Sequence, residues 1–471
     1  MAGIAAYGVY VPLYRLGPET IGWSGRGEKA VANYDEDSIT MAVAAAMNCL
    51  EGRDAGQVDG LYFASTTQPY SEGPSAAMVA TAAGLRRDII TVDCSNSLRA
   101  GTTALKLAVD SVKSGAARQI LVVAADLRVP VPSSSIEPVL GNGAVAFLIS
   151  DTGVAASVED SYALSDEILD YWREDGHSTV RFWEDRFNID MGYNRALPEA
   201  VDGLMKKTNL AASDFARAVF YAPDARRHSD MAKRLGFDGQ QVQDGMFNVL
   251  GNTGAALALM LLTAALEEAK PGDRILLAGY GSGANAILLQ ATDEINVIKG
   301  RRTLLKQLDS KRMISDYAKY LAWRGHIVTA DPARRPPDEV PSPANVYRNR
   351  DRNIRFYGVK CKTCGALLYP PMRICVNCQT RDNFEPYRFA DKKATLFTYS
   401  YDFIGRTKDP PVIIAYIDFE GGGRARLMMA DGDIAELKQG MPLELTFRRL
   451  YTDTNEGIHD YYWKCTPVRI A

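Results

Sequence analysis

The sequence predicts an α/β protein with an internally duplicated core, followed by a zinc ribbon and a small β-barrel. Residues 1–295 alternate short Val/Ile/Leu-rich strands with Ala-rich helices, as a parallel α/β architecture requires. A pattern of strand, glycine-rich turn and strand occurs twice in this region, which indicates duplication. Two CxxC pairs and then five short strand-like runs follow the α/β region.

Bulk composition excludes several classes of partner. A chain of 471 residues corresponds to about three domains. Its net charge of −3 gives no basic surface for nucleic acid or for an anionic membrane. No apolar run approaches the roughly 20 residues that span a bilayer. The N-terminal residues lack the basic start and long apolar stretch of a signal peptide, so we expect a cytoplasmic protein with reduced thiols.

The α/β elements are predicted from local hydrophobic runs. A strand is expected at Asp88–Asp93, a helix at Ala100–Ser114 and a strand at Gln119–Ala124. In the first copy of the repeated pattern, the two strands are Ile120–Ala125 and Gly141–Ser150. In the second copy, they are Arg274–Ala278 and Asn285–Gln290, joined by the turn Gly279–Ala284. Residues 296–330 are interpreted as helix.

The rest of the chain divides into a linker and two small modules. Residues 331–344 are rich in Pro and charge, which is typical of a stiff linker. We predict domains at 1–330, at 345–384 (a helix and a zinc ribbon) and at 385–471. Five strands separated by Gly, Asp and Asn turns fit a barrel of the OB type in the last of these: Thr395–Tyr401, Val412–Phe419, Arg424–Met429, Leu443–Arg448 and Asp460–Pro467.

The cysteine spacing predicts a structural zinc site. Cys361, Cys364, Cys375 and Cys378 form two CxxC pairs within eighteen residues. Two such pairs can converge on one tetrahedral Zn²⁺, each supplying two thiolates from a tight turn. All four coordination positions are then filled, which leaves none for a catalytic water.

Several blocks resemble the thiolase superfamily, and within it the archaeal-type hydroxymethylglutaryl-CoA synthases and the ketoacyl synthase III enzymes. The blocks include LRAGTTAL (Leu98–Leu105), DYWREDG (Asp170–Gly176), GNTGAA (Gly251–Ala256) and PGDRILLAGYGSGA (Pro271–Ala284). Residues 345–471 resemble the rubredoxin-like zinc-ribbon/OB-fold proteins that associate with such enzymes. The resemblance implies a five-layer αβαβα fold, a homodimer, an acyl-CoA substrate, chemistry at the carbon beside a thioester, and another thiolase-family enzyme as a possible partner.

The three reactive groups of this superfamily are changed here. The resemblance places Leu98 at the position of the nucleophilic cysteine, Thr66 at that of the acid/base glutamate and Tyr221 at that of the histidine. A leucine cannot be acylated. Asn252 and the loop of Gly281, Ser282 and Gly283 persist, and they could polarise a thioester carbonyl. We take Thr66, Leu98 and this loop as substrate-binding candidates, and Tyr221 and Asn252 as catalytic candidates.

Cys94 is an alternative nucleophile, from a register shifted by four residues. It follows a β-run and precedes Ser95, Asn96 and Ser97, which are good residues to begin a helix. A thiolate near a helix N-terminus is favoured by the backbone dipole. The other interpretation of Cys94 is a buried structural cysteine.

Three hypotheses for function follow. The main one is an aldol or retro-aldol enzyme without a covalent acyl intermediate, because such a step needs only an oxyanion site and a group that moves one proton. Tyr221 would move that proton and Asn252 would polarise the carbonyl. The alternative is a Claisen-type acyltransferase that uses Cys94. The third is a catalytically degenerate scaffold that binds CoA thioesters.

Overall fold

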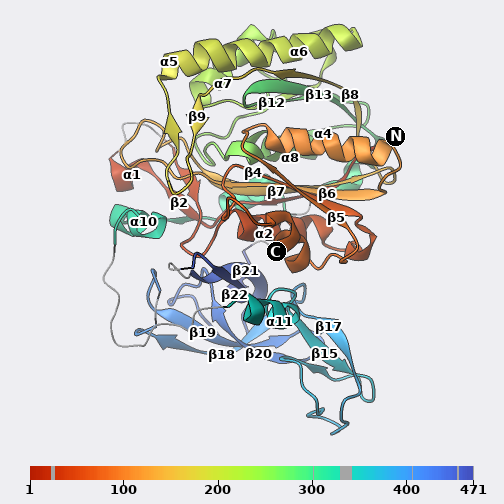
Figure 1. Cartoon of the computed structure of the whole chain (residues 1–471), viewed down its shortest axis with the longest axis vertical. Coiled ribbons are helices and arrows are strands. Elements are labelled where there is room, and N and C mark those ends of the chain that lie inside the picture. Colours follow the sequence, from red (N-terminus) through yellow and green to blue (C-terminus); the bar gives the residue numbers. More distant parts are fainter. Residues whose placement is uncertain (23–26, 301, 329–341, 406, 453–455, 470–471) are drawn as a thin grey trace. The chain divides into compact units, whose positions relative to one another are not determined.

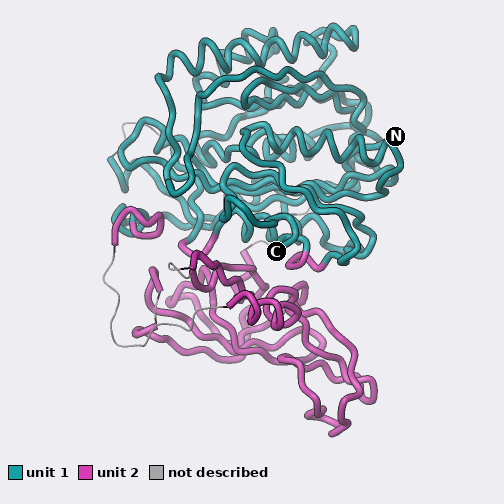
Figure 2. The backbone as a smooth tube through the Cα atoms, viewed as in Figure 1, with its two compact units in different colours: residues 1–33, 37–80, 85–321 teal, residues 34–36, 81–84, 322–471 magenta. Residues whose placement is uncertain are grey.

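A computed structural model describes the chain (Figure 1) except for residues 23–26, 301, 329–341, 406, 453–455 and 470–471. The described residues form two compact units (Figure 2). The first contains residues 1–33, 37–80 and 85–321, and the second contains residues 34–36, 81–84 and 322–471. Two short segments of the N-terminal chain therefore belong to the second unit.

The first unit has the predicted five-layer αβαβα arrangement (Figure 1). Its main sheet has nine strands in the described residues, in the order β11-β12-β13-β8-β1-β7-β6-β4-β5. The two halves of this sheet lie in separate layers with the helices α4 and α8 between them. The helices α6 and α7 cover one outer face and α2 covers the other. The resulting core is one continuous cluster of buried apolar side chains.

The elements of the first unit have the following bounds. The helices are α1 (Pro18–Ile21), α2 (Ser38–Leu50), α3 (Ser75–Ala82), α4 (Ala100–Lys113), α5 (Asp185–Phe187), α6 (Asn194–Thr208), α7 (Ala225–Arg234), α8 (Leu257–Glu268), α9 (Leu304–Asp309) and α10 (Tyr317–Arg324). The strands are β1 (Gly3–Tyr10), β2 (Tyr14–Leu16), β3 (Lys29–Val31), β4 (Gly60–Ser65), β5 (Ile90–Ser95), β6 (Gln119–Leu127), β7 (Asn142–Ser150), β8 (Ala156–Ser165), β9 (Tyr171–Trp172), β10 (Arg181–Phe182), β11 (Arg217–Phe220), β12 (Arg274–Tyr280), β13 (Gly283–Ala291) and β14 (Arg312–Met313).

The internal repeat is visible in the strand pairing. In one half β4 runs parallel to β6, which pairs antiparallel with β7. In the other half β11 runs parallel to β12, which pairs antiparallel with β13. The expected helix from Ala100 also forms, as α4.

Local chemistry explains how α2 begins and packs. The Asp37 carboxylate accepts the Thr40 N–H at 2.9 Å, while the Thr40 hydroxyl accepts the Asp37 N–H at 2.8 Å, which is a capping box. The helix packs closely on β1 at Gly8, where a Cβ atom would lie 2.3 Å from the Cys49 nitrogen. A larger residue at Gly8 would force the strand and the helix apart.

Residues 296–330 differ from the single helix that we predicted. The segment contains two short helices, α9 and α10, separated by β14, which pairs in parallel with β2. The intervening Ser310 ends α9 in an extended conformation. Tertiary pairing therefore overrides the helical tendency of the charged, Leu- and Tyr-containing sequence.

The second unit contains the ribbon and the closed barrel. The helix α11 (Pro343–Asn353) precedes a three-stranded sheet of β15 (Tyr357–Cys361), β16 (Leu367–Leu368) and β17 (Phe384–Arg388). The barrel has the order β18-β19-β20-β22-β21. Its strands are β18 (Ala394–Asp402), β19 (Val412–Phe419), β20 (Arg424–Met429), β21 (Pro442–Thr452) and β22 (His459–Pro467), so the five predicted strands are confirmed.

Two further expectations concern the chain as a whole. Most of the predicted linker, residues 331–344, lies outside the described residues, and the domain boundaries on either side of it stay predictions. Within the described residues, the helices are all too short or too polar to cross a bilayer.

Candidate functional site

The start of α4 lies directly against the glycine loop that follows β12. A Cβ atom on Gly281 would lie 2.7 Å from the Ser97 Oγ and 2.8 Å from the Leu98 nitrogen. The Ser97 hydroxyl donates to the Gly281 carbonyl at 3.0 Å. Gly281 has φ of +156° and Ser282 has φ of +47°. The structure therefore brings Leu98 and the Gly281–Gly283 loop together.

Leu98 offers no reactive atom at this junction. Its side chain is 9% exposed and belongs to the main hydrophobic core. It lies two residues before the first residue of α4. The side chain can therefore shape a binding surface but cannot form a covalent intermediate.

Cys94 lies on the wall of a pocket of about 510 Å³. It is the fifth residue of β5, and its side chain is partly buried. The other lining residues come from the start of α4, the end of β8 and the glycine loop: Ser95, Asn96, Ser97, Arg99, Ala100, Thr103, Ser165, Asp166, Glu167, Gly281 and Ser282. Burial, and then the adjacent Asp93 carboxylate, raise the pKa of the Cys94 thiol.

Tyr221 and Asn252 meet in the buried interior. The Asn252 Nδ2 donates to the Tyr221 hydroxyl oxygen at 3.1 Å, and also reaches the Ala222 and Pro223 carbonyls. The Asn252 Oδ1 accepts the Gly254 N–H at 2.9 Å. Among the described residues, none accepts the Tyr221 proton within hydrogen-bond distance. Asn252 therefore orients the oxygen of this phenol.

A group of tyrosines surrounds Tyr221. The Tyr193 hydroxyl donates to the Tyr221 carbonyl at 3.0 Å, and the Tyr280 ring stacks on the Tyr221 ring at 6.1 Å between centroids. The Tyr280 hydroxyl donates to the buried Asp170 carboxylate at 2.7 Å. Burial raises the pKa of Tyr221, and Arg128 and Asn252 oppose that shift, so the phenol is protonated at neutral pH.

Thr66 is held by a carboxylate that the sequence analysis missed. Its backbone N–H and its hydroxyl both donate to Asp126, at 2.7 and 2.9 Å. The Ala255 N–H donates to the same carboxylate at 2.8 Å. Asp126 therefore joins the Thr66 loop to the segment after Asn252. A single aspartate in a strand-like run carries no motif, so no sequence signal pointed to it. In the sequence analysis, Asp170 and Tyr280 appear only as members of the blocks Asp170–Gly176 and Pro271–Ala284.

The four cysteines of the ribbon converge. Their sulfur atoms all lie within 4.8 Å of one another, with Cys361–Cys378 and Cys364–Cys375 both at 3.6 Å. Four sulfurs at about 2.3 Å from one Zn²⁺ would be about 3.8 Å apart at the edges of a tetrahedron. The donor set and its spacing therefore fit a structural zinc ion.

Comparisons with known proteins agree with this fold. The family model for the 3-oxoacyl-[acyl-carrier-protein] synthase III C terminal matches residues 205–290. The chain is 33% identical over 344 residues to hydroxymethylglutaryl-CoA synthase of Methanosarcina mazei, covering 69% of this chain and 98% of the relative. It is 35% identical to the synthase of Aeropyrum pernix, covering 69% and 95%.

Solved structures show the same architecture. A crystal structure of HMG-CoA synthase complexed with CoA matches with a TM-score of 0.59 at 20% identity, covering 67% of this chain and 88% of that one. The structure of MvaS in complex with 3-hydroxy-3-methylglutaryl coenzyme A matches with a TM-score of 0.58 at 22% identity, covering 73% and 94%. At these identities the likeness establishes the thiolase-like fold, which was predicted.

Proposed function

Because the chain belongs to the hydroxymethylglutaryl-CoA synthase family of the thiolase superfamily, we propose that it is an acyl-CoA condensing enzyme in which Cys94 carries the first acyl group. Coenzyme A thioesters are then its substrates. The aldol-type reaction without a cysteine, our main hypothesis from the sequence, is not supported by these relatives. They fit the Claisen-type alternative better, since they are hydroxymethylglutaryl-CoA synthases.

The observation that carries the proposal is the position of the Cys94 thiol. It lines the 510 Å³ pocket together with Ser97, Gly281 and Ser282. The pocket is thus bounded by the start of α4 and by a glycine loop whose exposed residue is Ser282, since Gly281 is buried and its N–H donates to the Gly283 carbonyl at 2.9 Å. We propose that the backbone N–H of Ser282 stabilises the oxyanion that forms when a thiolate attacks a thioester. Arg99, which also lines this pocket, adds a positive charge at its rim.

The condensation divides into three balanced steps. In the first, the Cys94 sulfur bonds to the thioester carbonyl carbon, the bond from that carbon to the CoA sulfur breaks, and CoA leaves with the proton that Cys94 loses. In the second, the acyl α-carbon loses a proton and its electron pair bonds to the ketone carbon of a 3-oxoacyl-CoA, whose ketone oxygen takes a proton. In the third, water adds to the carbonyl carbon of the Cys94 thioester, the bond from that carbon to the Cys94 sulfur breaks, and the sulfur regains a proton as the acid product leaves.

The buried tyrosine group supports the second step. Tyr221 is a protonated phenol whose proton has no acceptor among the described residues, so it is our candidate donor to the new alkoxide. Asp170, held by Tyr280 at 2.7 Å, is our candidate to accept the α-proton. Thr66 is not a candidate for accepting the α-proton, because its hydroxyl already donates to Asp126.

A homodimer is part of the proposal. The strand β5 is the last strand in the order of the main sheet, and its residue Ile90 is 56% exposed. An edge strand with apolar side chains is a ready template for pairing with a second strand. Pairing of β5 with its copy in a second chain would cover this edge close to Cys94.

The ribbon is proposed to hold one Zn²⁺ through Cys361, Cys364, Cys375 and Cys378. The ion would supply folding energy and take no part in the reaction, because four thiolates fill its coordination sphere. The OB identity of the barrel and an association with another thiolase-family enzyme are likewise proposals that rest on resemblance alone.

Acyl transfer tests the proposal directly. The protein is incubated with acetyl-CoA, quenched in acid and digested, and the Cys94 peptide is examined by mass spectrometry for a 42-Da acetyl increment expected from the chemistry of thioester exchange, about one per chain. CoA release on addition of acetoacetyl-CoA then measures turnover. Binding of acyl-CoA without an adduct or turnover would instead favour the scaffold hypothesis.

A further inference from the structure

The second unit contains a buried site that binds carboxylates. The segment bound there comes from the distant N-terminal part of the chain. The residues of the second unit are drawn from three stretches, 34–36, 81–84 and 322–471 (Figure 2). The first of these, Tyr34–Glu36, has the sequence YDE and so brings two acids. The chemistry around it shows what kind of group the site accepts.

Two cations of the barrel form the centre of the site. Arg448 lies on β21 and Lys464 on β22, and they are 1% and 3% exposed. Thr446 is the register partner of Lys464 across these strands, so Arg448, two residues further along β21, lies on the same face. Buried cations destabilise a fold unless each meets an anion.

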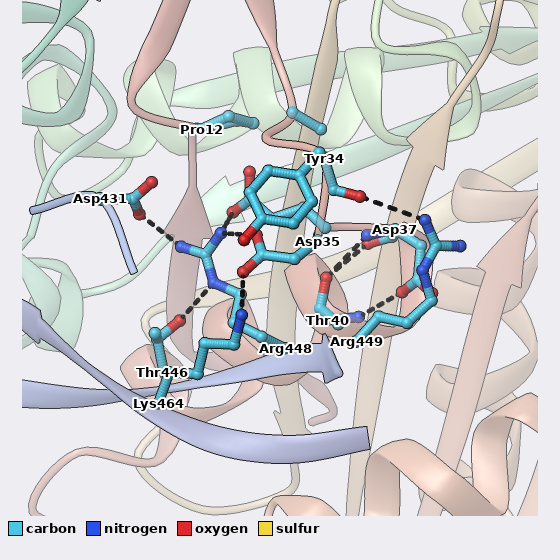
Figure 3. A network of polar contacts seen from close by, with 12 residues as sticks. Pro12, Tyr34, Asp35, Asp37, Thr40, Asp431, Thr446, Arg448, Arg449 and Lys464 are labelled. Carbon is cyan, nitrogen blue, oxygen red and sulfur yellow. Dashed lines mark hydrogen bonds and ion pairs between the residues drawn. The ribbon is translucent and has the colours of Figure 1, made fainter. Parts of the chain in front are cut away.

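The anions come mainly from the early segment. The Asp35 carboxylate accepts from the Lys464 Nζ at 2.8 Å and from the Arg448 Nη1 at 3.0 Å (Figure 3). The Glu36 Oε1 lies 3.1 Å from the same Arg448 nitrogen. Asp431, within the barrel module itself, accepts from the Arg448 Nη2 at 2.5 Å. Two of these three buried carboxylates thus belong to Tyr34–Glu36.

Backbone and ring contacts fix the same segment. The Arg449 N–H donates to the Asp35 carbonyl at 2.9 Å, and the Arg449 guanidinium reaches the Tyr34 carbonyl at 3.2 Å. The Thr407 hydroxyl donates to the Tyr34 hydroxyl at 2.9 Å. The Lys464 Nζ lies 5.7 Å from the centre of the Tyr34 ring, within range of a cation–π contact. The segment is therefore bound through main chain, ring and carboxylates together.

Electrostatics agree with this geometry. Burial opposes ionisation of Asp35, yet Lys464 and Arg448 hold the pKa of its carboxyl below the ordinary value. The pKa of Lys464 is raised: burial opposes the shift, and Asp35 outweighs it. Each group thus keeps its charge because the other is present.

The segment 81–84 is held in a similar way. The Arg388 Nη2 donates to the Ala82 carbonyl at 2.6 Å. Gly84 has φ of +79°, and a Cβ atom there would lie 2.7 Å from the Arg388 Cζ. A guanidinium of the ribbon's last strand therefore binds a carbonyl at the end of α3, where the free carbonyls favour a cation.

We propose that the barrel module carries a recognition site for an acidic peptide segment, formed by Arg448 and Lys464, and that Tyr34–Glu36 of the same chain is its resident ligand. The barrel module is then connected to Tyr34–Glu36 in two ways, by this non-covalent binding and by the covalent linker. The site is independent of the condensing chemistry, and its ligand class is an acidic dipeptide with a preceding aromatic residue, bound as a turn.

Cutting the linker tests this proposal on the whole chain. A protease site is inserted among residues 331–341, the purified chain is cut once, and the dissociation constant of the two fragments is measured by analytical ultracentrifugation. The wild-type fragments are expected to stay associated at micromolar concentration. The D35N/E36Q variant, which removes the charges and keeps the shapes, is expected to weaken association at least ~100-fold, since breaking buried pairs costs that much or more.

Matched variants make the result decisive. E72Q removes a carboxylate on an exposed residue, and R424M removes an arginine whose partner is Asp418 on the barrel surface; both should leave the association unchanged. K464M combined with D35N should recover part of the affinity lost in either single variant. If D35N/E36Q does not fold, E36Q alone should weaken association about tenfold. Wild-type fragments that separate, or equal losses in R424M and K464M, would overturn the proposal.

Discussion

The Asn252 side-chain amide lies 3.1 Å from the Tyr221 hydroxyl, although 31 positions separate the two residues. Tyr221 follows β11, and Asn252 lies a few residues before α8. The amide holds the phenol oxygen as an acceptor, and among the described residues none accepts the phenol proton. In the proposed reaction, this pair is the candidate proton donor to the developing alkoxide.

Removing the Tyr221 hydroxyl should therefore slow the condensation. Tyr221→Phe is expected to lower kcat by about 100- to 10,000-fold, the range for loss of a positioned proton donor, with little change in KM. Steady-state kinetics with two acyl-CoA substrates measure both constants. Tyr193→Phe is the control, because Tyr193 donates only to a backbone carbonyl in the same group. Equal losses in both variants would show that Tyr221 serves packing alone.

Acylation of Cys94 should accelerate as pH rises. Burial and then Asp93 raise the pKa of its thiol, so the reactive thiolate is a minor form at neutral pH. Asp93→Asn removes the nearby negative charge and should shift the rate profile toward lower pH. Rates of alkylation by iodoacetamide at Cys94, followed by mass spectrometry, give this profile. A profile that Asp93→Asn leaves unmoved would contradict the electrostatic assignment.

His228 should make the protein sensitive to acid. Burial lowers the pKa of this histidine from 6.5 to about 4, and Asp244 only partly opposes the shift. The unfolded chain takes up a proton below pH 6.5 and the folded chain does not, so roughly 3 kcal/mol of stability is present above pH 6.5 and lost as pH falls toward 4. Urea unfolding across this range should show the loss.

Two variants isolate this effect. His228→Gln should flatten the pH dependence of the unfolding free energy between pH 6.5 and 4, since glutamine does not titrate there. His177→Gln, at a largely exposed histidine, should keep the wild-type slope. The same slope in both variants would place the acid sensitivity elsewhere.

Removal of zinc should unfold the ribbon selectively. The buried cluster of the ribbon in the described residues is small, with Cys361 and Cys375 among its three buried members, so metal binding must supply much of its stability. A strong chelator should abolish protection of the β15 and β17 amides in hydrogen exchange while β6 and β7 stay protected. Protection of the ribbon without any metal would contradict the zinc assignment.

Elements set by local pattern could be predicted from the sequence. The bounds of β19 and β20 agree with the expected strands, because turn residues delimit the apolar run of β19 and the partly alternating run of β20. The segment 296–330 was predicted less well, because β14 forms by pairing with the distant β2.

The candidate site shows the same limit. The Leu98, Tyr221 and Asn252 positions came from recognisable blocks, and the structure places Leu98 against Gly281 and Asn252 against Tyr221. Asp126 carries no local signal, since its role depends on contacts with Thr66 and with Ala255, 129 positions away. Placement of Tyr34–Glu36 in the second unit depends on Lys464, 429 positions from Asp35, and no local pattern encodes such a contact.

The most direct measurement of the central claim is the acyl-enzyme itself. Wild-type protein and Cys94→Ala are each treated with acetyl-CoA and then with acetoacetyl-CoA, with the adduct read by mass spectrometry and the product by chromatography. We predict an acetyl group on Cys94 that disappears as condensed product forms, and neither adduct nor product in Cys94→Ala. Condensed product from Cys94→Ala at the wild-type rate would contradict this prediction.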